Sequence, residues 1–327
     1  MNFPVLLETV RKNCEITDAR HARNMTMCTY LLEMQQYYRW ENSIPYAESL
    51  PREKLGNWLV EKEKSWSEIE TLPYLAIDGE IDPFDSDAVN RRILQQGLVY
   101  GAGYGRFGKP HFFLGRLADR ATREGFSVLV SECEYARDLT SPVAALQGST
   151  IFLRREAVKR MIWERREELR WKGRASPYSC GDADCESMLE SACEAVILHE
   201  IGEGMAGALL GKEWEEMLSG EISPHEEILA RAMRDLLADC LSTLPSLVLG
   251  KDPIAIHFHF EHFKGMRREL FPMALDAYRQ WSSDGNVLPL LLAAEAGREH
   301  WLAECRKMLC LHESGEALQE QGAGFIL

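Results

Sequence analysis

The sequence lacks long hydrophobic runs. No stretch approaches the roughly 18–20 consecutive apolar residues that a helix needs to cross a bilayer, although hydrophobic residues make up 46% of the chain. The first residues, MNFPVLLETVRK, also lack the basic start, apolar stretch and cleavage site of an export signal. We therefore expect a protein that is neither membrane-embedded nor exported and that resides in the cytoplasm.

Positive charge is also in short supply. Lys and Arg number 37 against 51 Asp and Glu, so the formal net charge is -14. Because proteins bind nucleic acids chiefly through Lys and Arg that displace counterions from phosphates, we expect no nucleic-acid partner. The one basic stretch runs from Arg154 to Arg174. Its apolar spacing predicts a solvated helix face with i,i+4 ion pairs such as Arg160–Glu164.

The nine cysteines offer no disulfide framework. Their number is odd, and most lie in apolar helical stretches, as Cys28, Cys193 and Cys240 do, where a free thiol packs as a small hydrophobe. We predict that they are reduced. Cys180 and Cys185 flank a short loop, but two thiols without a second pair make a poor zinc site. We interpret them as ordinary loop residues.

What the chain does have is enough length for two cores. Its 327 residues exceed the roughly 250–300 that one core serves. We predict a helical N-terminal unit over residues 1–155, with a short β-sheet within about 111–154, and a helical bundle over 156–327. Strands are expected at 111–117, 126–133 and 149–153, the first two antiparallel. The predicted fold class is mainly α with a small antiparallel β segment, α+β.

Hydrophobic periodicity predicts the helices. A helix over 18–42 is apolar nearly all round and should be buried, so that its Glu33 would need Arg39 or His21 as a partner. A polar amphipathic helix then ends near Glu70. The later helices are expected at 156–172, 186–211, 224–248, 253–281 and 287–311, separated by Gly, Pro and Ser.

One glycine-rich segment carries part of a phosphate-binding motif. Gly103–Lys109 has the letters of a phosphate-cradling loop, but Pro110 replaces the Ser or Thr that would hold magnesium. A strand also follows where the motif needs a helix N-terminus. We predict a turn that enters a strand.

An acidic segment resembles a calcium loop in its alternation. In Asp78–Asp87, however, Pro83 stands where the sharp turn needs Gly, and Val89 stands where the bidentate Glu belongs. We predict a solvated loop that caps the next helix, with Asp85 or Ser86 at its start.

The helix expected over 186–211 carries the candidate site. Its apolar stripe includes His199 and Glu203, one turn apart. Side chains at i and i+4 project side by side, so one rigid helix can present an imidazole and a carboxylate to a single metal ion. Glu200 points to a neighbouring face and could act as a general base on a metal-bound water.

The segment Leu198-His-Glu-Ile-Gly-Glu203 resembles the active helix of the zincin metallopeptidases, His-Glu-x-x-His, with Glu203 in place of the second histidine. In the Glu-type zincins a later helix supplies an acidic third ligand, and an Asp four positions on orients a ligating histidine. Asp235-Leu-Leu-Ala-Asp239 occupies that place here. The resemblance, which covers these two helices only, implies Asp235 as third ligand and Asp239 as the orienting residue, or the two roles exchanged.

One imidazole and two carboxylates form an oxygen-rich ligand set. Such a set suits manganese, iron or magnesium at least as well as zinc, and its negative charge makes a bound water less acidic. The leading hypothesis is a metal-binding protein that acts as a zincin-like, metal-dependent hydrolase. Its cofactor would be a divalent zinc, manganese or iron ion, and its substrate a small molecule or a peptide.

Two other functions stay open. In a non-enzymatic helical scaffold or partner-binding protein the same polar groups would form structural ion pairs, for example between Glu203 and His199, Arg231 or Arg234. A carboxylate-bridged di-metal oxidase would need acidic residues from four helices together with Glu-x-x-His pairs, and the chain has no such pair at the expected places.

A second group of candidate residues follows in the segment Ile256–Phe263. It contains His257, His259 and His262 together with Glu261. On a helix each histidine points in a different direction, so the segment is no ready-made chelate. We predict that His257, which shares a face with Glu261, is an accessory residue that lends a ligand or shuttles protons. The alternative is a set of partly buried or interface histidines.

Overall fold

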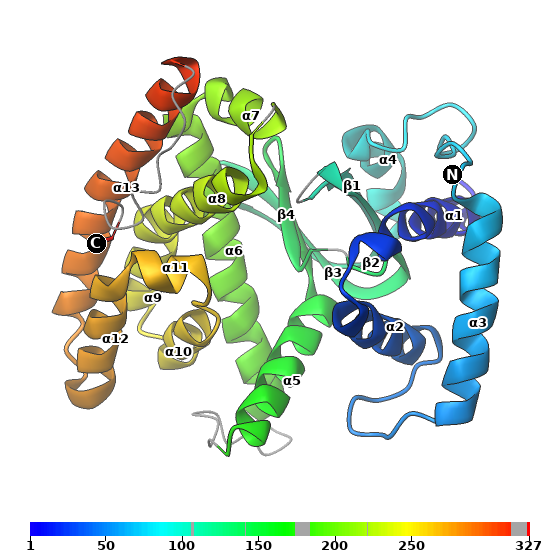
Figure 1. The fold of residues 1–327 in the computed structure, drawn as a ribbon, viewed down its shortest axis with the longest axis horizontal. Helices are drawn as coiled ribbons and strands as arrows, with labels where there is room; N and C mark the ends of the chain where they lie inside the picture. Colours follow the sequence, from blue (N-terminus) through cyan, green and yellow to red (C-terminus); the bar gives the residue numbers. More distant parts are fainter. Residues whose placement is uncertain (106–107, 141, 174–183, 221, 315–325) are drawn as a thin grey trace. The chain divides into compact units, whose positions relative to one another are not determined.

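The computed structural model of the chain describes residues 1–105, 108–140, 142–173, 184–220, 222–314 and 326–327 (Figure 1). It has two compact units, which interleave along the sequence. The first comprises Met1–Ala121, Leu129–Val143 and Arg154–Arg165, and the second comprises Thr122–Val128, Ala144–Leu153 and Arg166–Leu327. The predicted fold class is confirmed: the protein is α+β, mainly helical, with one sheet and a helical C-terminal half.

The first unit begins with four helices. They are α1 (Phe3–His21), α2 (Met27–Glu41), α3 (Arg52–Ile69) and α4 (Ser86–Ile93). The single helix predicted over 18–42 is wrong, because a 3-10 turn at Ala22–Asn24 separates α1 from α2, and Thr26 caps α2 by accepting a hydrogen bond from the Thr29 amide.

The expected burial of this region was also wrong in part. Met27 of α2 is 70% exposed. The Glu33 carboxylate pairs with Arg160 at 2.7 Å rather than with Arg39 or His21. Arg160 also binds Glu164 at 2.6 Å, as the i,i+4 spacing predicts. Two acidic side chains therefore neutralise one cation of the basic stretch.

The sheet has five strands, in the order β1-β2-β3-β5-β4. The strands are β1 (Leu98–Tyr104), β2 (Pro110–Arg123), β3 (Phe126–Arg137), β4 (Ala144–Gln147) and β5 (Thr150–Arg154). β2 and β3 meet at Glu124 and Gly125, which have φ values of 48° and 87°, as the two central residues of a tight hairpin turn require. The three predicted strands are present, and β1 and β4 are additional.

The glycine-rich segment forms a β-hairpin. β1 pairs antiparallel with β2, from Leu98 opposite Arg116 to Tyr104 opposite Pro110. A Cβ on Gly101 would lie 2.3 Å from the Phe113 ring, so this glycine makes room for an aromatic side chain. The predicted turn into a strand is confirmed, and a helix N-terminus, which a phosphate-cradling loop requires, is absent from the described part of this segment.

The second unit contains most of the remaining helices. α5 (Arg155–Trp171) runs from the first unit into the second, and it is followed by α6 (Asp184–Leu210), α7 (Lys212–Ser219), α8 (Pro224–Ala238), α9 (Leu244–Gly250), α10 (Pro253–Glu261), α11 (Met266–Leu270), α12 (Pro272–Asp284) and α13 (Leu288–Ser314). A π-helical turn, Asp239–Thr243, joins α8 to α9. Among the described residues no helix is both long enough and apolar enough to cross a membrane.

Two details of this unit differ from the predicted helices. The helix expected over 253–281 is three helices, because Gly265 adopts a positive φ of 57° and Pro272 starts a new helix. The short helix α7 was not predicted. Seven cysteines have described side chains, and all are free thiols: Cys14, Cys28, Cys133, Cys193, Cys240, Cys305 and Cys310.

Candidate metal centre

The candidate site lies within the second unit, where α6 meets α8 (Figure 1). His199 and Glu203 lie one turn apart on α6, and the Nε2 atom of the imidazole is 3.7 Å from Oε1 of the carboxylate. Both side chains are about one-fifth exposed. The i,i+4 spacing therefore does place an imidazole and a carboxylate together, within reach of solvent.

α8 adds a third group. One ligand atom from each of His199, Glu203 and Asp235 lies within 4.8 Å of the other two. A glycine allows this approach, because a Cβ on Gly202 would lie 2.3 Å from the carbonyl oxygen of Ala238. The start of α8 is fixed by a capping box at Ser223, so the helix that carries Asp235 begins at a defined residue.

The π-helical turn positions Asp239 behind the histidine. This carboxylate is fully buried, and its Oδ1 lies 2.9 Å from Nδ1 of His199. A π turn inserts one extra residue into a helical ladder and recurs at functional sites. With Nδ1–H donated to Asp239, the Nε2 atom is left facing Glu203 and Asp235, which is the arrangement found around histidines that ligate metals.

Two further groups hold Asp239. The Nη2 atom of Arg267 donates to Oδ2 at 2.6 Å, and Nε2 of His259 lies 3.9 Å from the same oxygen. Burial alone would raise the pKa of Asp239, but the charges of Arg267, His259 and His199 outweigh burial and hold that pKa well below its usual range. Asp239 is therefore a fixed anion.

The histidine responds to that anion. Burial would lower the pKa of His199, but the charge and hydrogen bond of Asp239 raise it to about 9. The pKa values of the two proposed carboxylate ligands, Asp235 and Glu203, shift in opposite directions. Burial and the negative charge of Glu203 raise the pKa of Asp235, whereas Arg234 and His199 outweigh the effect of burial on Glu203 and lower its pKa.

An arginine closes the site on one side. Arg234 places Nη2 3.0 Å from Oε2 of Glu203 and Nη1 3.4 Å from Oε1 of Glu215. Arg231, the other predicted partner of Glu203, binds Glu227 at 2.8 Å instead. The structural ion pair considered in the sequence analysis therefore exists, and it coexists with the three-residue group.

Glu200, the predicted general base, is almost fully buried on α6. Its burial, followed by the charge of Glu203, raises the pKa of its carboxyl to about 8. The charges of His199, Arg234 and Asp235 also shift this pKa. Glu200 therefore interacts electrostatically with these three residues and with Glu203.

The predicted accessory residues are His257 and Glu261 of α10. Nδ1 of His257 is 2.8 Å from the hydroxyl of Tyr278, and its ring packs against Trp281. The part of His257 and Glu261 in the metal centre stays a prediction. His259 is the histidine that approaches it, a fact that sequence spacing could not reveal because His259 reaches Asp239 through the fold rather than along a helix.

Other predicted sites have ordinary structural roles or lie outside the described residues. Asp78 and Glu80 of the acidic segment pair with Arg92 at 3.2 and 2.8 Å. Asp85 caps α4 by accepting a hydrogen bond from the Ala88 amide at 2.8 Å, as predicted. Cys180 and the side chain of Cys185 lie outside the described part of the chain.

The donor set fits a single divalent ion. One imidazole and two carboxylates from two rigid helices leave coordination positions for water and substrate, as catalytic sites require. The oxygen-rich set is compatible with zinc, manganese or iron. Among the described residues only one group of this kind occurs.

Comparison with known proteins identifies a family. The model of the N-terminal domain of a family of unknown function, DUF6866, matches residues 5–154, and the model of its C-terminal domain matches residues 159–324. The metal centre lies in the C-terminal match. No curated protein and no solved structure matches the chain.

Proposed function

This chain belongs to the DUF6866 family, and from the geometry of its C-terminal domain we propose that it is a metal-dependent hydrolase. Its single divalent ion would be held by His199, Glu203 and Asp235. The observation that supports the proposal is the approach of their ligand atoms within 4.8 Å of one another.

The neighbouring residues have roles that suit such a site. A bound divalent ion would act as a Lewis acid on the bond to be cleaved and would make water a better nucleophile. Asp239 would orient His199 through Nδ1, and Glu200 would accept the proton of the attacking water. The resemblance of this helix to that of the zincins supports the same division of roles. We further propose that the substrate is a small molecule or a peptide and that the protein works in the reducing cytoplasm.

Elemental analysis tests the proposal directly. Protein purified without chelators should contain close to one equivalent of zinc, manganese or iron, and Glu203→Ala should lose it. Glu190→Ala, an exposed glutamate on the same helix, is the matched control and should retain the metal. No bound metal in the wild type, or equal metal in Glu203→Ala and the wild type, would exclude this function.

A second substitution separates binding from catalysis. Glu200→Gln keeps the size and polarity of the side chain but cannot accept a proton, so it should retain the metal and lose hydrolysis of any substrate that the wild type cleaves. Loss of about 10²–10⁴-fold is the usual effect of removing a general base. Equal loss of metal and activity would assign Glu200 to the ligand set instead.

The pairing of Glu203 with Arg234 and of Asp239 with Arg267 favours one alternative function. In a non-enzymatic scaffold the polar residues would serve only to stabilise the fold through these ion pairs. Thermal melting with and without added metal distinguishes the two, because an ion that binds the folded state raises the melting temperature by mass action. A scaffold should show no such rise.

A further inference from the structure

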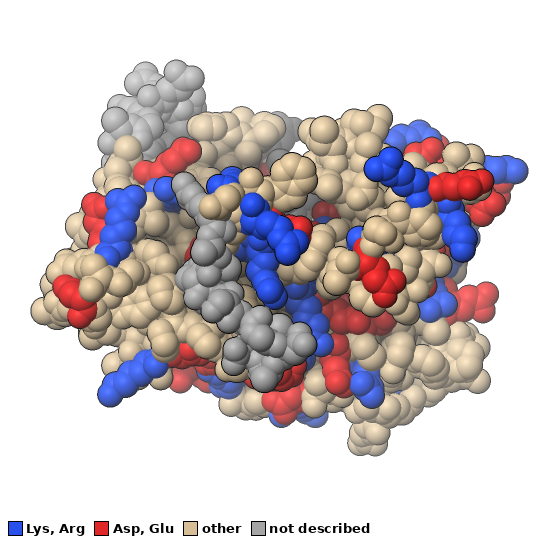
Figure 2. All heavy atoms as spheres, turned by 90° about the horizontal axis from the view of Figure 1, so that it is seen from below, with Lys and Arg blue, Asp and Glu red and all other residues tan. Residues whose placement is uncertain are grey.

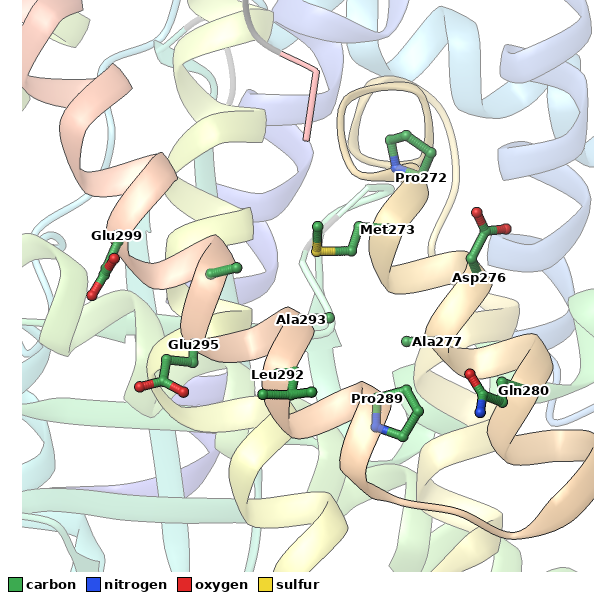
Figure 3. Close-up of a pocket in the computed structure, with 11 residues that line it drawn as sticks. Pro272, Met273, Asp276, Ala277, Gln280, Pro289, Leu292, Ala293, Glu295 and Glu299 are labelled. Carbon is green, nitrogen blue, oxygen red and sulfur yellow. The ribbon is translucent and has the colours of Figure 1, made fainter.

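An apolar groove of about 880 Å³ lies between α12 and α13, away from the residues of the metal centre (Figure 3). Met273 on α12 and Leu292 on α13 point into it, and Ala277, Pro289 and Ala293 complete its floor. Met273 is 42% and Leu292 55% exposed. Large apolar side chains left this open side by side mark an interaction site more often than a plain surface.

The groove is elongated. Its lining residues run from Pro272 to Gln280 on α12 and from Pro289 to Glu299 on α13. At 1.5 Å per residue these stretches are about 12 and 15 Å long. That length matches two to three turns of a helix, whose apolar side chains at i, i+3 or i+4, and i+7 would follow the floor.

The charges around the groove have one sign. Asp276 flanks it on the α12 side, Glu295 and Glu299 flank it on the α13 side, and no Lys, Arg or His occurs among the described lining residues. Asp276 is neutralised by Arg279 at 2.6 Å. Glu295 and Glu299 have no hydrogen bond or ion pair with the described residues.

The two glutamates also repel each other. They lie at i and i+4 on α13, where like charges destabilise a helix. A cationic partner would relieve this repulsion while its apolar face covers Met273 and Leu292. The apolar floor and the uncompensated acidic rim thus point to the same kind of occupant.

We propose that this groove binds a basic amphipathic helix of a partner protein, with its apolar side chains on the floor and Lys or Arg beside Glu295 and Glu299. Helix-in-groove recognition of this kind is known in other proteins, where apolar side chains of the bound helix anchor it in a hydrophobic groove. It is independent of the metal centre.

The test uses the full-length protein and a fluorescein-labelled helical peptide of about 14 residues, made of leucines at i, i+3, i+4 and i+7 spacing and lysines elsewhere. Fluorescence anisotropy should give a Kd of about 10 µM. Leu292→Arg, and separately the double variant Glu295→Lys/Glu299→Lys, should each weaken binding at least about tenfold.

Two controls distinguish binding in this groove from non-specific attraction of the basic peptide to an acidic protein. Glu61→Lys/Glu68→Lys on α3 makes the same change in net charge at exposed positions and should change the Kd by less than about threefold. A scrambled peptide of the same composition should bind at least about tenfold more weakly.

Three results would overturn the proposal. The α3 control could weaken binding as much as the groove variants, or the scrambled peptide could bind equally well. Sedimentation could instead reveal self-association that Leu292→Arg abolishes, which would assign the groove to a second copy of this chain.

Discussion

Arg234 is the residue at which the two interpretations of the metal centre diverge. It binds Glu203 and Glu215. In a scaffold this contact is a structural ion pair, whereas in a metal site Arg234 neutralises Glu203 while no metal is bound. Substitution by Met keeps the aliphatic stem and removes the charge. In a scaffold nothing would replace the lost positive charge, whereas in a metal site a bound metal ion would neutralise Glu203 in place of Arg234.

We therefore predict that Arg234→Met destabilises the metal-free protein by about 3–5 kcal/mol, because a mostly buried carboxylate loses its partner. Saturating metal should recover most of this loss. Urea denaturation with and without zinc or manganese measures both effects. Arg279→Met is the control, because the pair of Arg279 with Asp276 on α12 is exposed and such a pair is worth only about 0.3–0.5 kcal/mol. Failure of metal to restore Arg234→Met would favour the scaffold.

The residue scale also shows how far the site could be predicted. The proximity of His199 and Glu203 followed from helical spacing, since i,i+4 neighbours on one helix meet regardless of the fold, whereas Asp235 was implied only by the resemblance to the zincins. Arg267 and His259 could not be found in this way. They come from separate short helices, and only tertiary packing brings them to Asp239.

At the scale of elements, long periodic helices were predictable and glycine-rich strands were not. α5, α6 and α13 begin and end within a few residues of their predicted bounds, and α3 ends beside the predicted Glu70, because the apolar stripes of these helices are long. β1 contains Gly101 and Gly103 and reads locally as a loop. Its extended conformation comes from pairing with β2, a contact that local sequence does not encode.

The basic helix α5 illustrates the same point for charge. Its arginines and lysines suggested a solvated face. Arg170 and Lys172 are exposed and pair with Glu167 and Glu168, but Arg160, which pairs with Glu33 and Glu164, is only 15% exposed. On the face shown in Figure 2, basic and acidic side chains are interspersed. The i,i+3 and i,i+4 partners were predictable from spacing, whereas Glu33, more than a hundred residues away, was not.

The contact between α6 and α8 depends on a single glycine, which leads to a prediction for these elements. Gly202→Ala would place a Cβ 2.3 Å from the Ala238 carbonyl oxygen, so the helices must move apart. We expect a loss of about 1–3 kcal/mol in stability and weaker metal binding, because Asp235 would withdraw from His199.

A matched control lies on the same helix. A Cβ on Gly207 would meet nothing within 4 Å, so Gly207→Ala should stabilise the protein by about 0.5–1 kcal/mol through helix propensity alone. Equal effects of the two substitutions, measured by urea denaturation, would show that close packing at Gly202 does not limit the approach of the helices.

At the scale of the whole molecule, one buried carboxyl group makes a distinct contribution to the dependence of stability on pH. Asp18, near the end of α1, is 1% exposed and accepts the Leu139 amide at 2.9 Å. The Nζ atom of Lys109 lies 3.9 Å from Oδ1 of Asp18 and 3.6 Å from Oδ1 of Asp138. These residues tie the first helix to the end of β3, more than a hundred positions later.

Burial, followed by the negative charge of Asp138, raises the pKa of Asp18 to about 8, whereas an unfolded Asp titrates near pH 3.9. Between these values the folded state holds a proton that the unfolded state releases, so the contribution of Asp18 to stability falls as the pH rises from about 4 to 8. Asp18→Asn retains an acceptor for the Leu139 amide and cannot ionise.

We therefore predict that the stability of Asp18→Asn relative to the wild type increases from pH 5 to pH 8 and is constant above about pH 8. Thermal or urea denaturation at several pH values measures the difference, which cancels the titration of all other groups. Asp119→Asn, at an exposed position of β2, should give a difference that does not vary with pH. If the curves of Asp18→Asn and the wild type run parallel from pH 5 to 8, the Asp18 carboxyl is already ionised in the folded protein, and Lys109 rather than a bound proton compensates its charge.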